Sequence, residues 1–181
     1  MQSKNTHMVA GKTGVWRIDS VTAVKGETLE MAPRLDVVEG ALGPCDCAWK
    51  LQGFRSNTRY TTKSEQASLT AIQSGLGRPE ATRGSLIPIR KNAAWWALAQ
   101  DERRAIMEEQ SRHIAIGLEY LPDIARRLYH SRDLGEPFDF LTWFEFAPEH
   151  EGAFDDLVKR LRASREWEYV DREVDLRLTR V

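Results

Sequence analysis

The chain has 181 residues, 41% of them hydrophobic and 29% charged, a composition typical of one ordinary globular domain. Its 26 basic and 27 acidic residues give a net charge of −1, so no overall field favours binding to nucleic acid or to an anionic membrane. The first residues lack the apolar core of a signal peptide, and no later run approaches the roughly 18 apolar residues of a membrane span. We therefore expect an unprocessed, cytoplasmic protein. Cys45 and Cys47 are too close in sequence for an easy disulfide and too few for a metal site, so we expect loop thiols.

The first half of the sequence predicts strands and one helix. Residues 1–13 are polar and lack periodicity, which indicates an extended arm, whereas residues 15–24 alternate apolar and polar side chains as a half-buried strand does. Scattered Gly and Pro indicate a long surface connection over residues 26–44. We then expect a strand over 48–62 with a turn at Ser56 and Asn57, a helix from its cap at Ser64 to Gly77, and a strand over 85–92, in which Pro88 marks an edge position or a bulge.

The second half repeats this alternation of helices and strands. We expect helices over 93–112, 120–130 with Pro122 in its first turn, and 148–163, and strands over 138–146 and 167–180. Short strands with helices on one face predict an α+β fold rather than a parallel doubly wound sheet. Within a single domain spanning residues 1–181, we expect two ferredoxin-like halves, about 14–92 and 93–181.

The stretch from Lys91 to Arg126 contains the first functional candidate, His113, near the end of the helix that begins with Trp95 and Trp96. A neutral imidazole is the commonest protein ligand for a transition metal, and a large planar cofactor needs wide apolar walls. A haem pocket is therefore one hypothesis. A lone histidine beside apolar residues is more often structural, so the residue pattern leaves both interpretations open. The rival ligands are weaker candidates, since the pattern places them in the polar arm (His7) or at solvent-facing element ends (His130, His150).

Six segments carry a resemblance to a known family. They are SNTRYTT at 56–62, AIQSGLGRPEA at 71–81, IPIRKNAAWWAL at 87–98, DERRAIMEEQSRHIAIG at 101–117, LPDIARRLYHSRDLGEPFDFLTWFEFAPEHEGAF at 121–154 and EWEYVDRE at 166–173. In order and spacing they resemble the chlorite dismutases, in particular the short, dimeric type. The pair Cys45 and Cys47 lies outside these segments, in a region where the family varies.

The resemblance implies a homodimer of α+β barrels with haem b in the C-terminal half of each chain. It also implies an activity: chlorite is decomposed to chloride and dioxygen, by oxygen-atom transfer to ferric haem and recombination with hypochlorite. His113 matches the axial iron ligand, Glu166 the carboxylate that accepts its other N–H, and Arg126 the distal arginine that acts on the substrate. The remaining matches are Lys91 and Tyr60 near the haem propionates, Trp95 and Trp96 in the aromatic wall, and Gln73 as a distal amide.

Elementary chemistry agrees with these roles without requiring them. A carboxylate bonded to the far nitrogen of a ligating histidine fixes its tautomer. From the sequence alone, however, Glu166 is more often a plain solvated acid, and Glu168 is the nearby alternative. On the predicted helix, Arg126 and Arg127 would point about 100° apart, so only one would enter a pocket.

Three other functions stay open. Coproheme decarboxylase has the same fold but usually carries glutamine at the distal position, so Arg126 argues against it. A peroxidase-like haem enzyme is a second alternative. A haem carrier without catalysis is a third, and it would have no use for Arg126.

Overall fold

The structure, a computed structural model, describes residues 5–55 and 59–181. The strands are β1 (Asn5–Gly11), β2 (Trp16–Lys25), β3 (Arg34–Glu39), β4 (Cys47–Phe54), β5 (Arg83–Lys91), β6 (Ala125–His130), β7 (Phe140–Phe146) and β8 (Val170–Arg180). The α-helices are α1 (Lys63–Ile72), α2 (Ala93–Ala97), α3 (Gln100–Arg104), α4 (His113–Glu119) and α5 (Glu151–Arg162). A π-helix, η1 (Ala105–Gln110), and the 3₁₀ turns η2 (Arg132–Leu134), η3 (Pro148–His150) and η4 (Arg165–Tyr169) complete the described elements.

The described strands close into one antiparallel barrel in the order β1-β3-β2-β8-β5-β7-β6-β4. Strands β5 to β8 with their intervening helices form a ferredoxin-like βαββαβ unit, and β1 to β4 repeat the same strand order without helices between them. The two sets meet along β2 and β8, and again where Phe54 of β4 pairs with His130 of β6. The predicted α+β class is therefore confirmed, while the division near residue 92 stays a prediction.

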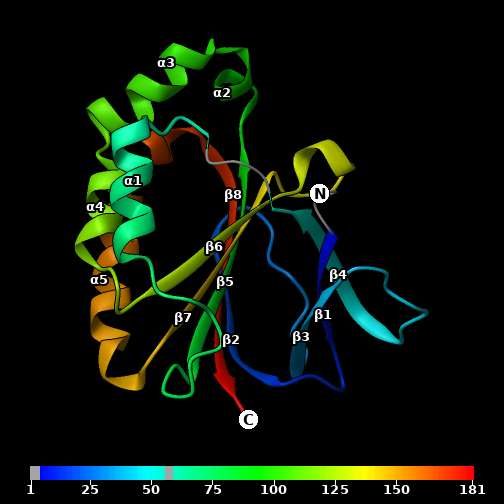
Figure 1. Cartoon of the computed structure of the whole chain (residues 1–181). Coiled ribbons are helices and arrows are strands. Elements are labelled where there is room, and N and C mark those ends of the chain that lie inside the picture. The colour runs from blue at the N-terminus through cyan, green and yellow to red at the C-terminus, as the bar shows by residue number, and fades with distance from the viewer. Residues whose placement is uncertain (1–4, 56–58) are drawn as a thin grey trace.

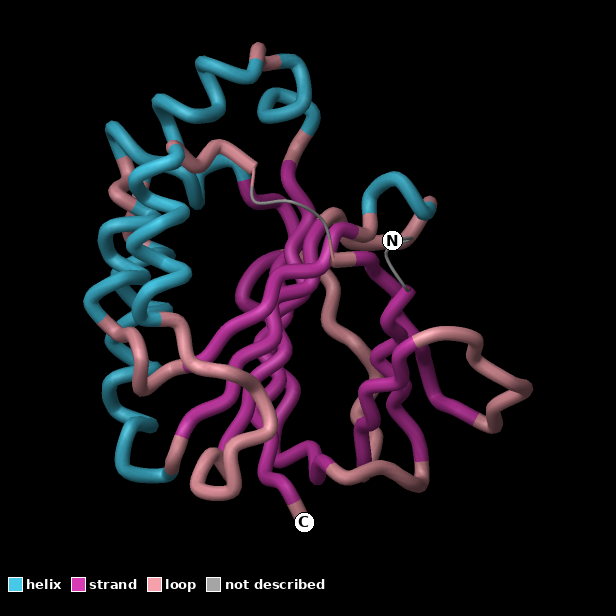
Figure 2. Tube along the Cα trace, in the orientation of Figure 1, coloured by secondary structure: helices cyan, strands magenta, loops and turns pink. Residues whose placement is uncertain are grey.

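The helices gather on one side of this barrel. Figures 1 and 2 show them over the outer face of the sheet formed by β5 to β8, with β1, β3 and β4 on the opposite side of the molecule. No helix in the described residues is long and apolar enough to cross a membrane. The helices cover the outer face of the β5 to β8 sheet, and a second hydrophobic core lies between the two layers.

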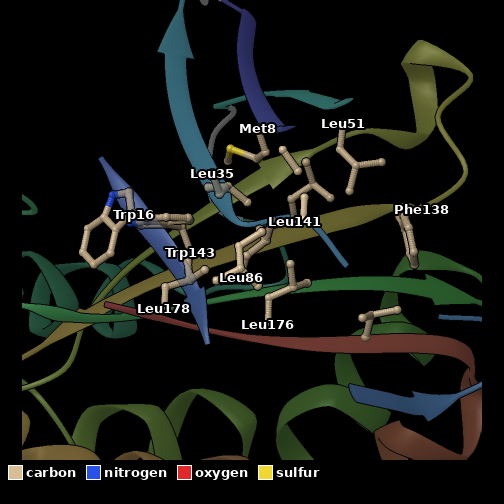
Figure 3. Close-up of a cluster of buried hydrophobic side chains, with 14 of the residues drawn as sticks. Met8, Trp16, Leu35, Leu51, Leu86, Phe138, Leu141, Trp143, Leu176 and Leu178 are labelled. Carbon is tan, nitrogen blue, oxygen red and sulfur yellow. The ribbon is translucent and has the colours of Figure 1, made fainter. Parts of the chain in front are cut away.

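Two hydrophobic cores result from this arrangement. The first fills the barrel with side chains from both sets of strands, among them Met8, Trp16, Leu35, Leu86, Leu141 and Trp143 (Figure 3). The second lies between the outer face of the β5 to β8 sheet and helices α4 and α5, and includes Ile87, Phe144, Phe154, Leu157 and Trp167. Each cluster buries many large apolar side chains, whose removal from water is the main force holding the fold together.

The strand prediction for 138–146 and the helix prediction for 148–163 are confirmed to within a few residues. In α5, Phe154, Leu157, Val158 and Leu161 are all buried, as their helical spacing predicted. The last strand begins at Val170, because residues Arg165–Tyr169 form the short 3₁₀ turn η4.

The prediction of an extended, polar N-terminal arm is wrong, because residues 5–11 form the strand β1 of the barrel wall. Its inward side chains are Thr6, Met8 and Ala10, all buried, and the alternation gave little signal because only Met8 is a large apolar residue. Similarly, the predicted surface connection contains β3, whose Leu35 is fully buried. The short length of β3 explains why it gave little signal.

Several local predictions in the first half also need correction. Strand β4 ends at Phe54, and the predicted turn at Ser56 and Asn57 lies outside the described residues. The cap of α1 is Thr62, not Ser64, because Thr62 and Glu65 form a reciprocal capping box. Helix α1 ends at Ile72, well before Gly77.

Pro88 does not lie at an edge, since β5 runs between β7 and β8. Pairing with β8 skips Ile87 and Pro88 and resumes in the same register, so the missing N–H is accommodated without a bulge at the proline.

Cys45 and Cys47 form a disulfide in this structure, so the expectation of free loop thiols is wrong. Cys47 is the first residue of β4, and Cys45 lies in the preceding loop. Both lie outside the segments that carry the functional candidates.

Two predicted helices have a different form. The helix over 93–112 is divided into α2, α3 and η1, with a break at Leu98 and Ala99. The helix over 120–130 is wrong: a cis Leu121–Pro122 bond precedes the strand β6, which pairs along its whole length with β7. Alanine, arginine and leucine favour helices, but tertiary pairing overrides such weak local preferences.

Candidate active site

A cavity lies between the outer face of the β5 to β7 sheet and helices α4 and α5. Part of it is open to solvent. Its polar lining residues are His113, Arg126, Thr142, Arg162 and Glu173, and its apolar ones are Ile87, Ile89, Phe144, Val158, Leu161 and Trp167. The two strongest functional candidates therefore share one largely apolar cavity.

His113 is the first residue of α4, not the end of the long helix that the sequence predicted. The preceding Arg112 adopts a left-handed conformation (φ 54°), which turns the chain between η1 and α4. The ring nitrogen Nδ1 of His113 lies 2.7 Å from Oε2 of Glu166. If Nδ1 donates to that carboxylate, the other nitrogen, Nε2, keeps a free lone pair for a ligand.

Glu166 is buried in η4 and held from three sides. Its Oε1 accepts a hydrogen bond from Nζ of Lys91 at 2.8 Å, and its backbone N–H donates to Oγ of Ser111 at 2.9 Å. Burial alone would raise the pKa of Glu166, but the charge of Lys91 and the hydrogen bonds with His113 and Lys91 hold it below its usual range. The carboxylate is therefore ionised and accepts from the imidazole. Glu168, the alternative partner, pairs instead with Arg165 at the surface.

Lys91 stands behind Glu166 instead of at the cavity. Its side chain is 3% exposed, and its ammonium lies 4.4 Å above the ring of Trp95. Its backbone N–H donates to Asp139 at 2.7 Å. The sequence analysis expected Lys91 near a haem propionate. In the structure, its ammonium bonds to the Glu166 carboxylate instead.

The paired tryptophans lie beside the site but do not line this cavity. Trp95 is buried between the rings of Tyr60 and Tyr169, with centroids at 6.2 and 5.6 Å. Trp96 stacks on Phe140 and donates from Nε1 to Asp139 at 3.2 Å. The apolar wall is supplied instead by residues that the sequence did not single out, above all Trp167, Phe144 and Ile87. The alternation of β7 predicted a buried Phe144, but nothing in it marked a cavity.

Tyr60 and Gln73 occupy the two ends of α1. The hydroxyl of Tyr60 accepts a bond from Arg103 at 3.3 Å, and its backbone is left-handed (φ 59°). Gln73 donates from its side-chain amide to the backbone carbonyl of Arg126 at 2.9 Å. Gln73 thus contacts the strand that carries the candidate arginine, although neither Gln73 nor Tyr60 lines the cavity.

Arg126 and Arg127 are neighbours on strand β6, so their side chains point to opposite faces of the sheet, not 100° apart as on a helix. Arg127 lies 3.7 Å from Glu39. Arg126 lines the cavity, and its guanidinium lies so close to Gly117 of α4 that a Cβ there would collide with it. Across residues 5–55 and 59–181, no carboxylate pairs with Arg126, and burial lowers its pKa. A cation without an anion therefore faces the cavity.

The rival histidines do not line the cavity. His7 bonds to the carbonyl of Gly40 from within β1, and His150 lies 3.8 Å from Asp123. His130, expected to face solvent, is instead buried between the rings of Phe54 and Phe140 because β6 is a strand.

Fold and site together define a class of protein. It is an antiparallel α+β barrel with an apolar cavity on the outer face of one sheet. A histidine on a helix and an arginine without a paired carboxylate among the described residues line this cavity, and a buried carboxylate bonds to the histidine. The chain belongs to the chlorite dismutase family, since the model of that family, described as chlorite dismutase, matches residues 45–181.

Individual relatives agree with this assignment. A crystal structure described as a dimeric chlorite dismutase from Nitrobacter winogradskyi is 56% identical, with a TM-score of 0.92, and the match covers 97% of this chain and 99% of that one. A curated chlorite dismutase from Ideonella dechloratans is 32% identical over 126 residues, which are 68% of this chain but only 42% of that protein. Chlorite dismutase from Candidatus Nitrospira defluvii in complex with imidazole, at 19% identity and a TM-score of 0.64 over 99% of this chain and 92% of that one, shares the fold.

Proposed function

We propose that this chain is a haem b enzyme that decomposes chlorite to chloride and dioxygen. The observation that carries the proposal is that His113 and Arg126 line the same cavity. One supplies a metal-binding nitrogen and the other an unpaired cation, which are the two groups that a haem enzyme acting on a small anion needs.

The residues around the cavity fit haem b. A haem needs one strong axial base and apolar walls, and here Nδ1 of His113 is engaged by Glu166 while Ile87, Phe144 and Trp167 surround the open side. When bound, the haem would supply the iron at which chlorite is cleaved. His113 would hold that iron, and Glu166 would strengthen the imidazole as a donor.

Arg126 would bind chlorite and retain hypochlorite. The overall reaction converts one chlorite anion to one chloride and one dioxygen, so its atoms and charge balance without a proton or a reductant. A guanidinium stays protonated throughout the working pH range, so its contribution is electrostatic and not proton transfer. The absence of a paired carboxylate for Arg126 in the described residues supports this role, because the charge remains available to an anion.

The alternatives explain less of the cavity. A haem carrier needs His113 but has no use for a buried cation beside it, whose desolvation has a cost. Coproheme decarboxylase and a peroxidase-like enzyme share the fold, and the same arginine weighs against the first.

We also propose that the protein is a homodimer, supported by the dimeric description of the 56% identical Nitrobacter protein. Sedimentation equilibrium measures this directly. A mass of twice the chain is expected, whereas a monomer or a pentamer contradicts the proposal.

The proposed activity is tested with an oxygen electrode. Haem-loaded wild type should release oxygen promptly when chlorite is added, and His113→Ala should lose most of its haem and its oxygen release. If haem-loaded wild type consumes no chlorite, the result contradicts the proposed enzymatic activity and supports a haem carrier. An unchanged Soret band in His113→Ala contradicts His113 as the ligand.

A further inference from the structure

The start of helix α4 lacks a cap of its own. The residue before it, Arg112, is left-handed and makes no capping bond with its side chain. The first amide groups of a helix have no partner within the helix, and an uncapped end frays. Because His113 is the first residue of α4, any fraying would begin at the proposed iron ligand.

The missing cap is supplied by Glu108 from the π-helix η1. Its carboxylate accepts the N–H of Ile114 at 2.6 Å and that of Ala115 at 3.2 Å. Its backbone carbonyl accepts the N–H of Arg112 at 2.8 Å. One residue therefore closes the whole turn that joins η1 to α4. Its negative charge also lies at the positive end of the helix dipole, where it is favourable.

His113 is thus held at two points. The ring is fixed by Glu166, and the backbone on its C-terminal side is fixed by Glu108 through the next two amides. Ser111 links the two attachments, because its hydroxyl accepts the N–H of Glu166. Loss of the ring contact would change the electronic character of the imidazole, whereas loss of the backbone contact would let it move away from the iron.

We propose that Glu108 is a positioning residue that holds His113 in place for the haem iron. The inference rests on the proposed haem binding through His113. Glu108 does not line the cavity, so we expect it to act through the start of α4. Its neighbour Glu109 provides a matched control, since it is exposed and no hydrogen bond or ion pair involves it among the described residues.

The experiment measures the rate of haem release from the loaded protein to excess apomyoglobin. Glu108→Ala should accelerate release about fivefold, the effect typical of a lost helix cap. Glu108→Gln keeps one accepting oxygen and should give an intermediate rate, while Glu109→Ala should match wild type.

Other outcomes would overturn the proposal. Equal rates in Glu108→Ala and Glu109→Ala contradict it, and so does faster amide exchange throughout β5 in the Glu108→Ala apoprotein, which would indicate a general loss of structure. Amide hydrogen exchange of Ile114 and Ala115 in the apoprotein separates the two proposals. A wild type that takes up no haem contradicts the proposed function, whereas unchanged exchange at these amides in Glu108→Ala contradicts the cap itself.

Discussion

Arg126 and Arg127 offer the clearest comparison between single residues. Adjacent residues of a strand face opposite sides, so Arg126 meets the cavity while Arg127 meets Glu39. Arg126→Ala should still bind haem but release oxygen about 100-fold more slowly, the typical loss for one preorganised electrostatic group. It should also leak hypochlorite, which a chlorination trap detects.

Arg127→Ala serves as the control and should keep nearly wild-type turnover. If the two variants exchanged these behaviours, Arg127 would be the residue in the cavity. If neither variant changed turnover, neither Arg126 nor Arg127 would have a part in handling the anion.

Glu166 has two separable effects because it bonds to both His113 and Lys91. Glu166→Gln leaves the Lys91 ammonium buried without its counter-charge, so the apoprotein should lose about 3–5 kcal/mol of unfolding free energy in urea. The same change should raise the ferric/ferrous potential of the loaded protein, because a less basic imidazole stabilises ferric iron less well.

The double variant Lys91→Met with Glu166→Gln separates these effects. It removes the stranded charge, so stability should largely recover while the potential remains raised. A potential equal to that of wild type in both variants would mean that the Glu166 carboxylate does not tune the ligand.

Among the elements, α1 is one that depends little on the core. None of its residues is buried, and it is fixed at its ends by the capping box of Thr62, by a two-bond ion pair between Glu65 and Arg104, and by Gln73. Arg104→Ala should therefore speed amide hydrogen exchange within α1 while leaving β5 protected.

Lys63→Ala, on the exposed side of the same helix, should leave exchange in α1 unchanged. Equal acceleration in α1 and β5 would show that Arg104 stabilises the whole fold and not this helix.

The elements also show what the sequence could and could not predict. Periodicity identified α5 and β7, because each presents a long apolar stripe to one core. It failed for β1 and β6, whose side chains depend on partners distant in sequence: β1 gains its place from β3 and β4, and β6 from β7.

The residues of the candidate site also divide into those that the sequence could predict and those that it could not. His113 and Arg126 could be predicted because family motifs carry them, and the structure brings both to one cavity. Glu108, Trp167 and the burial of Lys91 could not, because each depends on contacts between separate elements. The choice of Arg126 over Arg127 came from the resemblance to the family, and Arg126 lines the cavity although the predicted helix is the strand β6.

At the scale of the whole molecule, His130 makes stability depend on pH. Burial lowers its pKa from 6.5 to about 4, with Arg59 adding to the shift and Asp133 opposing it. His130 stays neutral in the folded protein but is protonated in the unfolded chain once the pH falls below about 6.5. The free energy of unfolding is therefore highest above pH 6.5 and falls as the pH drops toward 4. The free energy of unfolding falls by about 3 kcal/mol at most from this residue.

His130→Phe keeps a ring between Phe54 and Phe140 but does not titrate. Urea unfolding of both proteins between pH 7 and 4 should therefore show a steeper decline for wild type. Parallel curves would contradict a neutral, buried His130.

The most direct test of the proposed function is the stoichiometry of the reaction catalysed by the haem-loaded wild type. Oxygen release and chloride formation are measured together with chlorite consumption, without added reductant. If His113 binds haem b and Arg126 retains hypochlorite, each chlorite consumed should yield one dioxygen and one chloride. Chlorite consumption that yields hypochlorite or chlorate in place of oxygen would contradict the proposed function.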